Sequence, residues 1–286
     1  MISIFAKEAF LNTNPHEPFK NRTKPVTSGH LQRVSSIIRG DQIAEQLGAK
    51  LNPSKGYEND VCIYVKPHVK AGEDFTFDGK PYIDVVDGWG LLPLLKRHPW
   101  VGAIACSQQD YEKLSDVLPN KVVLIPQHHC NFERLQRQSL EIKKVGVIGT
   151  EGAFPLLPKG LEEALKERGI ELVKFSKFFD RGDILNFYMD IDVQIVWRPY
   201  RMKLSNSLKI VNAASFGIPT IAYDESVFQE VPGCYLPVRT LEDFLGALDR
   251  LIRSSELYSA ISDGCLMTAE RYHISNIAKL YKELDE

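Results

Sequence analysis

The sequence has few cysteines and no long apolar segment, and each absence excludes a class of protein. Its 286 residues include five cysteines, an odd number without any C-x-x-C pair (Cys62, Cys106, Cys130, Cys234 and Cys265). This pattern argues against a disulfide framework and a structural zinc site, and it is typical of a reducing cytosol. No window approaches the roughly 18 apolar residues of a membrane-spanning helix, and the start MISIFAKEAF lacks the pattern of a signal peptide. We therefore expect a cytoplasmic protein whose contact with membranes is at most peripheral.

The sequence also lacks a strong excess of charge of either sign. Its formal net charge is -2 at pH 7, which gives no general attraction to nucleic acid, so we expect no nucleic-acid partner. Any site for an anion must therefore be formed by a local group of residues. With 44% hydrophobic residues, the chain is long enough for one large domain or two of ordinary size.

Short apolar runs alternate with amphipathic stretches along the whole chain, which indicates a βαβ architecture. The runs predicted as strands are 2–6, 61–65, 82–86, 103–106, 122–125, 145–148, 172–175, 193–197, 220–222 and 234–238. A polar segment at 132–143 separates the two halves, so we predict domains at 1–135 and 136–286. The sequence thus predicts the α/β class, with two similar units facing across a cleft, where ligands commonly bind.

The most informative stretch is 192–223, DVQIVWRPYRMKLSNSLKIVNAASFGIPTIAY. Its apolar start predicts a buried strand, after which Arg198, Arg201 and Lys203 form a basic loop. Ser205 is placed to cap the helix that follows, and free N–H groups at a helix start favour an anion. Since ligands of open α/β sheets bind at the carboxyl ends of strands, this loop is a candidate phosphate site.

Further polar residues on the predicted helix extend this candidate site. Ser205, Lys209 and Asn212 share one helical face, and Asn206 lies beside them. Phosphate oxygens accept hydrogen bonds from guanidinium groups, ammonium groups and amides. Lys159, after a glycine-containing turn, could meet a diphosphate from the other side. The alternative is a solvated basic loop beside an ordinarily capped helix, with Lys159 a plain surface lysine.

Several carboxylates and one histidine are candidates for other roles. Asp84 and Asp87 flank the end of a first-half strand, where a carboxylate can accept a proton or bind a sugar hydroxyl. The alternative is a helix cap or a turn. Glu225 and Glu230 follow the last core strand and could reach the cleft. His30, in a long loop after the first strand, could lie near an acceptor, and a surface role is equally compatible.

The sequence predicts no metal site. His128, His129 and Cys130 have the right side-chain types, but adjacent residues rarely chelate one ion without a third partner. Asp190 and Asp192 form a D-x-D pair, but they lie where a helix gives way to a strand, so we interpret them as structural.

Four features of the second half form a recognisable pattern: Asp192-Val193 at a strand, Ser205-Asn206 at a helix start, the A-x-x-x-G-x-P pattern of Ala213, Gly217 and Pro219, and Glu230 before Gly233. With these features the second half resembles the donor-binding domain of GT-B glycosyltransferases, most closely the retaining enzymes of glycosyltransferase family 4. Weaker similarity extends the match to roughly residues 82–286.

The resemblance implies two Rossmann-like domains, an acceptor-side domain at 1–135 and a donor-binding domain with closing helices at 136–286. It implies a hexosyltransferase-like enzyme that moves a sugar from a nucleoside-diphosphate donor to an unknown acceptor, retaining, without a metal or other cofactor. The residues expected to bind the diphosphate are Lys159, Arg198, Lys203, Ser205, Asn206 and Lys209. Asn212 and Glu230 would bind the nucleoside, and Asp87 or His30 would be catalytic.

The sequence departs from the family at one important motif. The two glutamates that the family separates by seven intervening residues fall on Leu204 and Asn212, and neither residue is acidic. This departure motivates an alternative hypothesis, a non-catalytic GT-B-like module that binds a nucleotide or a glycan. A nucleotide-sugar epimerase of the same architecture is a further alternative.

Overall fold

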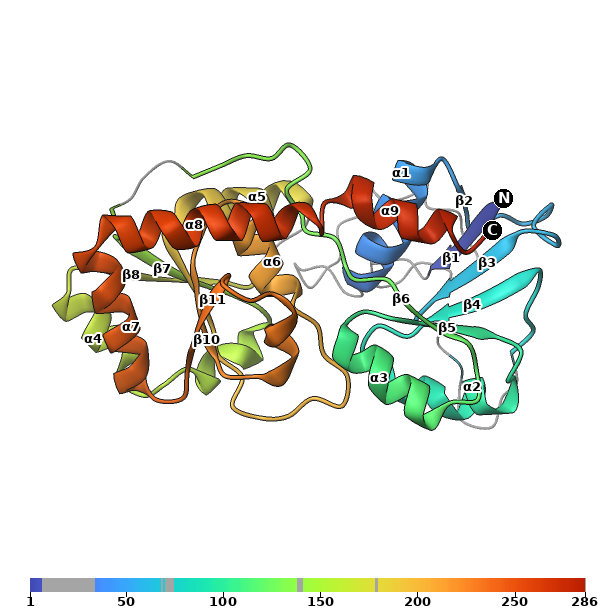
Figure 1. Ribbon diagram of the computed structural model, residues 1–286, viewed down its shortest axis with the longest axis horizontal. Coiled ribbons are helices and arrows are strands. Elements are labelled where there is room, and N and C mark those ends of the chain that lie inside the picture. Colours follow the sequence, from blue (N-terminus) through green and yellow to red (C-terminus); the bar gives the residue numbers. More distant parts are fainter. Residues whose placement is uncertain (7–33, 68, 70–74, 138–140, 178–179, 286) are drawn as a thin grey trace. The chain divides into compact units, whose positions relative to one another are not determined.

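A computed structural model describes residues 1–6, 34–67, 69, 75–137, 141–177 and 180–285. The chain forms two units, each built on its own parallel sheet (Figure 1). Unit 1 comprises Met1–His128, Met202–Asn206 and Ile274–Glu286, and unit 2 comprises His129–Arg201 and Ser207–His273. The chain thus passes from unit 1 to unit 2 just before the polar segment 132–143. It then returns to unit 1 twice, once at Met202–Asn206 and once at Ile274–Glu286.

The sheet of unit 1 has six strands in the order β2-β1-β3-β4-β5-β6, all paired in parallel. Their bounds are β1 (Ile2–Ala6), β2 (Lys50–Leu51), β3 (Val61–Val65), β4 (Lys80–Asp84), β5 (Gly102–Ala105) and β6 (Val122–Leu124). Every residue of β3 is buried, which explains why this strand is a continuous apolar run rather than an alternating one. The short β2 was not predicted, because two residues carry no readable periodicity.

Helices cover this sheet and close its core. Residues 34 and 35 are helical and lead through a π-helical segment, η2 (Ser36–Asp41), into α1 (Gln42–Leu47). The other helical elements of the described part of unit 1 are η3 (Trp89–Leu91), α2 (Leu92–Arg97), α3 (Gln108–Val117) and α9 (Ile274–Lys282). Ser107 caps α3 by accepting a hydrogen bond from the Asp110 backbone N–H at 3.1 Å. α9 buries one apolar stripe that includes Ile277 and Tyr281.

Unit 2 repeats the plan with five parallel strands in the order β11-β10-β9-β7-β8. The strands are β7 (Lys144–Ile148), β8 (Glu171–Phe175), β9 (Val193–Val196), β10 (Thr220–Tyr223) and β11 (Tyr235–Val238). Its described helical elements are η4 (Glu151–Leu156), α4 (Leu161–Glu167), α5 (Arg181–Asp190), α6 (Leu208–Ala214), η5 (Ser226–Glu230), α7 (Leu241–Arg253) and α8 (Ser255–Glu270). None of the helices in the described residues is both long and apolar enough to cross a bilayer.

The strand order of each unit contains one topological switch point. In unit 1, β1 lies between β2 and β3, and in unit 2, β7 lies between β8 and β9. The first strand connects to the strand on one side, and its neighbour β3 or β9 connects to the strand on the other side. At such a point of an open α/β sheet a ligand site is expected. Each unit therefore has a defined place for a ligand, at β1/β3 in unit 1 and at β7/β9 in unit 2.

Asp190 and Asp192 have the structural role that the sequence predicted. Asp192 is 1% exposed and accepts hydrogen bonds from the Lys143 and Lys144 backbone N–H groups, both at 2.8 Å, and from Arg137. It thereby joins the start of β7 to the start of β9. Asp190 forms an ion pair with Lys144 at 2.6 Å.

Candidate functional site

The crevice of unit 2 brings a glycine turn and a lysine together. Gly149 directly follows β7, and Lys209 lies in the first turn of α6, the helix after β9. A Cβ atom added at Gly149 would lie 3.2 Å from Lys209 Nζ, so the missing side chain leaves room for this ammonium group. No ion pair engages Lys209 within the described ranges. The ammonium group thus lies at the switch point of the sheet, where a ligand is expected.

A tightly held ion pair lies at the same edge of the sheet. Arg198 follows β9 and Glu225 follows β10. Arg198 Nε donates to both Glu225 carboxylate oxygens at 3.0 and 3.2 Å, and Nη2 donates to Oε2 at 2.5 Å. The Arg198 and Glu225 side chains are 25% and 13% exposed, so water only partly screens this ion pair.

Lys209 is affected electrostatically by this pair. Desolvation lowers the pKa of Lys209, the charge of Arg198 lowers it further, and the Glu225 carboxylate opposes both effects. The residue keeps an exposed surface, and its ammonium group lies beside Gly149. An anion bound at this position would favour the charged form of Lys209.

A buried polar network holds the start of α6. Gln194, in the middle of β9, is fully buried, and its Nε2 donates to the Lys209 carbonyl oxygen and to Thr220 Oγ1, both at 3.0 Å. Tyr188 donates its hydroxyl to Gln194 Oε1 at 2.9 Å. The sequence analysis missed Gln194, although one amide inside the apolar run VQIVW is a readable signal of such a network.

The predicted cap of α6 was wrong. The helix starts at Leu208, with Ser207 at the N-cap position, so Ser205 lies outside the helix. The Ser207 hydroxyl forms no cap bond and instead donates to Glu230 Oε1 at 2.6 Å. The sequence pattern predicted the start of α6 too early, because the start depends on the tertiary contacts of Ser205 and Ser207.

The predicted polar face of that helix does not exist either. Asn212 is 8% exposed, and its side-chain oxygen accepts a hydrogen bond from the Cys130 backbone N–H at 2.8 Å. Its neighbours Ile210, Val211, Ala213 and Ala214 are also buried, because α6 is covered on nearly all sides. Of the predicted stripe, only Lys209 is an exposed helical residue.

Three of the predicted phosphate ligands lie in a segment of unit 1. Lys203, Ser205 and Asn206 belong to Met202–Asn206. The Lys203 ammonium lies 5.6 Å from the centre of the Trp89 ring, and the Ser205 backbone N–H donates to the Asp110 carboxylate at 3.0 and 3.2 Å. Leu204 between them is 1% exposed and packs in the core of unit 1.

Lys159 is an exposed residue of unit 2. It precedes Gly160, which takes φ +80° at the start of α4. The glycine-containing turn before Lys159 includes the 3-10 helix η4, which begins at Glu151, two residues after Gly149.

In unit 1, the carboxylates after β4 have two different environments. Asp84 is fully buried and accepts hydrogen bonds from Arg39 Nε at 2.6 Å and from the Tyr281 hydroxyl at 3.2 Å. Asp87 is 46% exposed and forms an ion pair with Lys66 at 2.5 Å. Asp84 is therefore structural, whereas Asp87 can meet a ligand. His30 lies outside the described residues.

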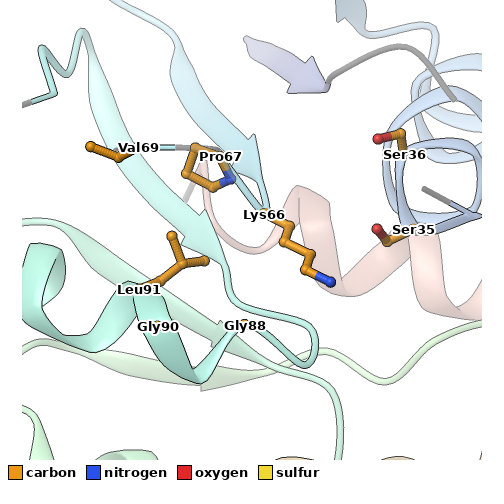
Figure 2. A pocket seen from close by; sticks show the side chains of 8 residues that line it. All are labelled: Ser35, Ser36, Lys66, Pro67, Val69, Gly88, Gly90 and Leu91. Carbon is orange, nitrogen blue, oxygen red and sulfur yellow. The ribbon is translucent and has the colours of Figure 1, made fainter. Parts of the chain in front are cut away.

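Lys66 belongs to a pocket of about 450 Å³ at the carboxyl ends of β3 and β4. Figure 2 shows Ser35 and Ser36, of the helix that contains η2, facing Lys66 across this pocket. The backbones of Lys66 and Val86 take φ +43° and +55°, a conformation that costs a non-glycine residue roughly 1–3 kcal/mol. Lys66 was also missed, although a lone cation directly after the buried strand VCIYV marks a strand end.

No protein-family model matches this sequence, and no curated protein matches it. Solved structures do match. TarM aligns over 82% of this chain and 52% of its own, with 12% identity and a TM-score of 0.52. Pneumococcal O-GlcNAc transferase GtfA, in complex with UDP and GlcNAc, aligns over 79% of this chain and 52% of its own, with 15% identity and a TM-score of 0.50. HepE of Anabaena, in complex with UDP and glucose, aligns over 71% and 70%, with 12% identity and a TM-score of 0.54.

This chain thus spans about half the length of TarM and GtfA. At such low identity, the similarity shows the fold. It confirms the predicted α/β class with Rossmann-like units of the GT-B type.

Proposed function

We propose that this protein is a glycosyltransferase that moves a sugar from a nucleoside-diphosphate donor to an acceptor. The observation that carries the proposal is the Lys209 ammonium beside Gly149 at the switch point of unit 2. The negative charge of a diphosphate is attracted by such an ammonium group, and a glycine turn allows the phosphate oxygens to approach the backbone. Two neighbours of the same fold, GtfA and HepE, have structures with UDP bound, which supports this class of donor.

The proposed chemistry uses cations to stabilise the leaving diphosphate. Lys209 and Arg198 would take up the negative charge that develops when the sugar–phosphate bond breaks. Lys159, from the other side of the turn, would complete the diphosphate site of unit 2. In this proposal no metal ion takes part, and transfer retains the anomeric configuration with assistance from the departing phosphate.

The nucleoside and the acceptor involve other residues. Glu230 and the amide of Asn212 would hold the nucleoside, although Glu230 is bonded to Ser207 and Asn212 to Cys130 in this structure. Asp87 would orient the acceptor hydroxyl or take its proton, because it is exposed at a strand end of unit 1. His30 is the other candidate for that role.

Two observations favour a second candidate, a non-catalytic module that binds a nucleotide or glycan. Leu204 is buried in the core and Asn212 is occupied by a backbone contact, so neither replaces a glutamate of the family motif. Binding without turnover would then be the function.

Calorimetry and a turnover assay test both candidates. UDP, GDP and ADP are titrated into the wild type, into Lys209→Met and into Lys166→Met, a control for an exposed lysine on α4 of unit 2. We expect one nucleotide to bind, and the Lys209 change to weaken it about tenfold or more while the control does not. Hydrolysis or transfer of the matching nucleotide sugar supports the enzyme, and binding alone supports the module. If no nucleotide binds, the result contradicts both the enzyme and a nucleotide-binding module.

A further inference from the structure

The pocket of unit 1 has the composition of a site for an anionic sugar. From its position and lining we infer that it binds a sugar carrying a phosphate or carboxylate group, with Lys66 as the cation that recognises the charge. The pocket lies at the carboxyl ends of β3 and β4, the edge of a parallel sheet at which ligands bind. The role of this ligand as the acceptor of the proposed transfer rests on the proposed function, but its binding to unit 1 does not.

The volume and the walls of the pocket fit a ligand of this size and mixed polarity. About 450 Å³ lies within the range of small-molecule sites. One wall is apolar, from Pro67, Val69 and Leu91, and suits the less polar face of a sugar ring. The opposite wall carries the Ser35 and Ser36 hydroxyls, which can donate to charged oxygens (Figure 2).

Lys66 can exchange its present partner for a ligand. Its ion pair with Asp87 leaves the two side chains 42% and 46% exposed. Exposed pairs of this kind contribute little to stability, because water and salt screen them. A phosphate or carboxylate reaching Lys66 from inside the pocket would replace a weak contact by a stronger, desolvated one. Asp87 is therefore a competitor for Lys66 in the free protein.

The backbone around Lys66 is held in place by buried interactions. Lys66 and Val86, which follow neighbouring strands, both have positive φ angles, and such strain persists only where the surroundings fix it. The Lys66 backbone N–H donates to the Asp84 carbonyl oxygen at 2.9 Å, and the Asp84 carboxylate is bound to Arg39 of the helix that carries Ser35 and Ser36. These contacts fix the walls of the pocket relative to each other.

Methyl NMR of the full chain, labelled at leucine and valine, tests this inference and locates the ligand. Leu91 and Val69 report on the pocket of unit 1, and Val196, at the end of β9, reports on the crevice of unit 2. The probes are glucose 6-phosphate, glucuronate and uncharged glucose, with UDP as a separate titration. Lys66→Met removes the charge, Lys96→Met is the matched control on α2, and Asp87→Asn removes the competitor.

We expect glucose 6-phosphate or glucuronate to shift Leu91 and Val69 at concentrations at which glucose does not. Lys66→Met should weaken this binding about tenfold, Lys96→Met should leave it unchanged, and Asp87→Asn should strengthen it several-fold. The inference is overturned if neither anion shifts these methyl groups, if glucose shifts them equally, or if a folded Lys66→Met variant binds like the wild type. UDP shifts at Val196 report separately on the proposed donor site, so the two proposals fail independently.

Discussion

Replacing Glu225 by glutamine should increase the affinity for a nucleoside diphosphate. In the free protein, Glu225 binds Arg198 through three close contacts and occupies the guanidinium that the proposal assigns to the diphosphate. A pair of opposite charges at 4 Å interacts by roughly 4 kcal/mol at an effective dielectric constant near 20. Desolvation and residual hydrogen bonding to glutamine reduce the net effect to about 1–2 kcal/mol, or about five- to thirtyfold in affinity.

The assay is isothermal titration of UDP, GDP and ADP at fixed salt concentration. Asp249→Asn is the matched control, because Asp249 also binds an arginine, Arg168, through two contacts in unit 2. It removes the same charge from the unit, so a general electrostatic effect would appear in both variants. Only the Glu225 change should increase affinity beyond that effect.

A decrease in affinity for Glu225→Gln would refute this reasoning. It would mean that the carboxylate itself binds the ligand, for example a ribose hydroxyl, and that Arg198 is not a diphosphate ligand. An unchanged affinity with an unchanged melting temperature would show that Arg198 does not take part at all.

Three further predictions follow from the same contacts. Gly149→Ala should weaken nucleotide binding about tenfold with little change in thermal stability, because the added methyl group displaces only the flexible tip of Lys209; equal affinity in calorimetry would contradict this. Since desolvation and Arg198 lower the pKa of Lys209 below 10.5, nucleotide affinity should fall as pH rises through that lowered value, and a Lys209→Met variant should lack the fall. Asp84→Asn should destabilise the protein by about 3–5 kcal/mol in urea unfolding, because it leaves the buried Arg39 without a counter-charge; a loss below about 1 kcal/mol would contradict this.

The strands were the most predictable part of the fold. Buried parallel strands are uninterrupted apolar runs, so the bounds of β1 and β3 were predicted to the residue, and most others to within one or two residues. The A-x-x-x-G-x-P pattern also located the end of α6, since Gly217 takes φ +73° after the helix. These features depend on local sequence, which can be read directly.

The candidate site was less predictable, because its residues depend on tertiary contacts. Ser205 and Ser207 are equally good caps in isolation, and the bond from the Ser205 N–H to Asp110, ninety-five positions away, is invisible in the sequence. Asn212 was predicted on an open face, but Cys130 covers it. Lys66 follows its strand without any motif, so only the folded structure shows that it meets a pocket.

The most direct test of the central claim is a crystal structure of the protein with the nucleoside diphosphate that binds best. Our account predicts that a phosphate oxygen lies within hydrogen-bonding distance of Lys209 Nζ, over the turn at Gly149. A nucleotide bound elsewhere, without contact to Lys209, would contradict it.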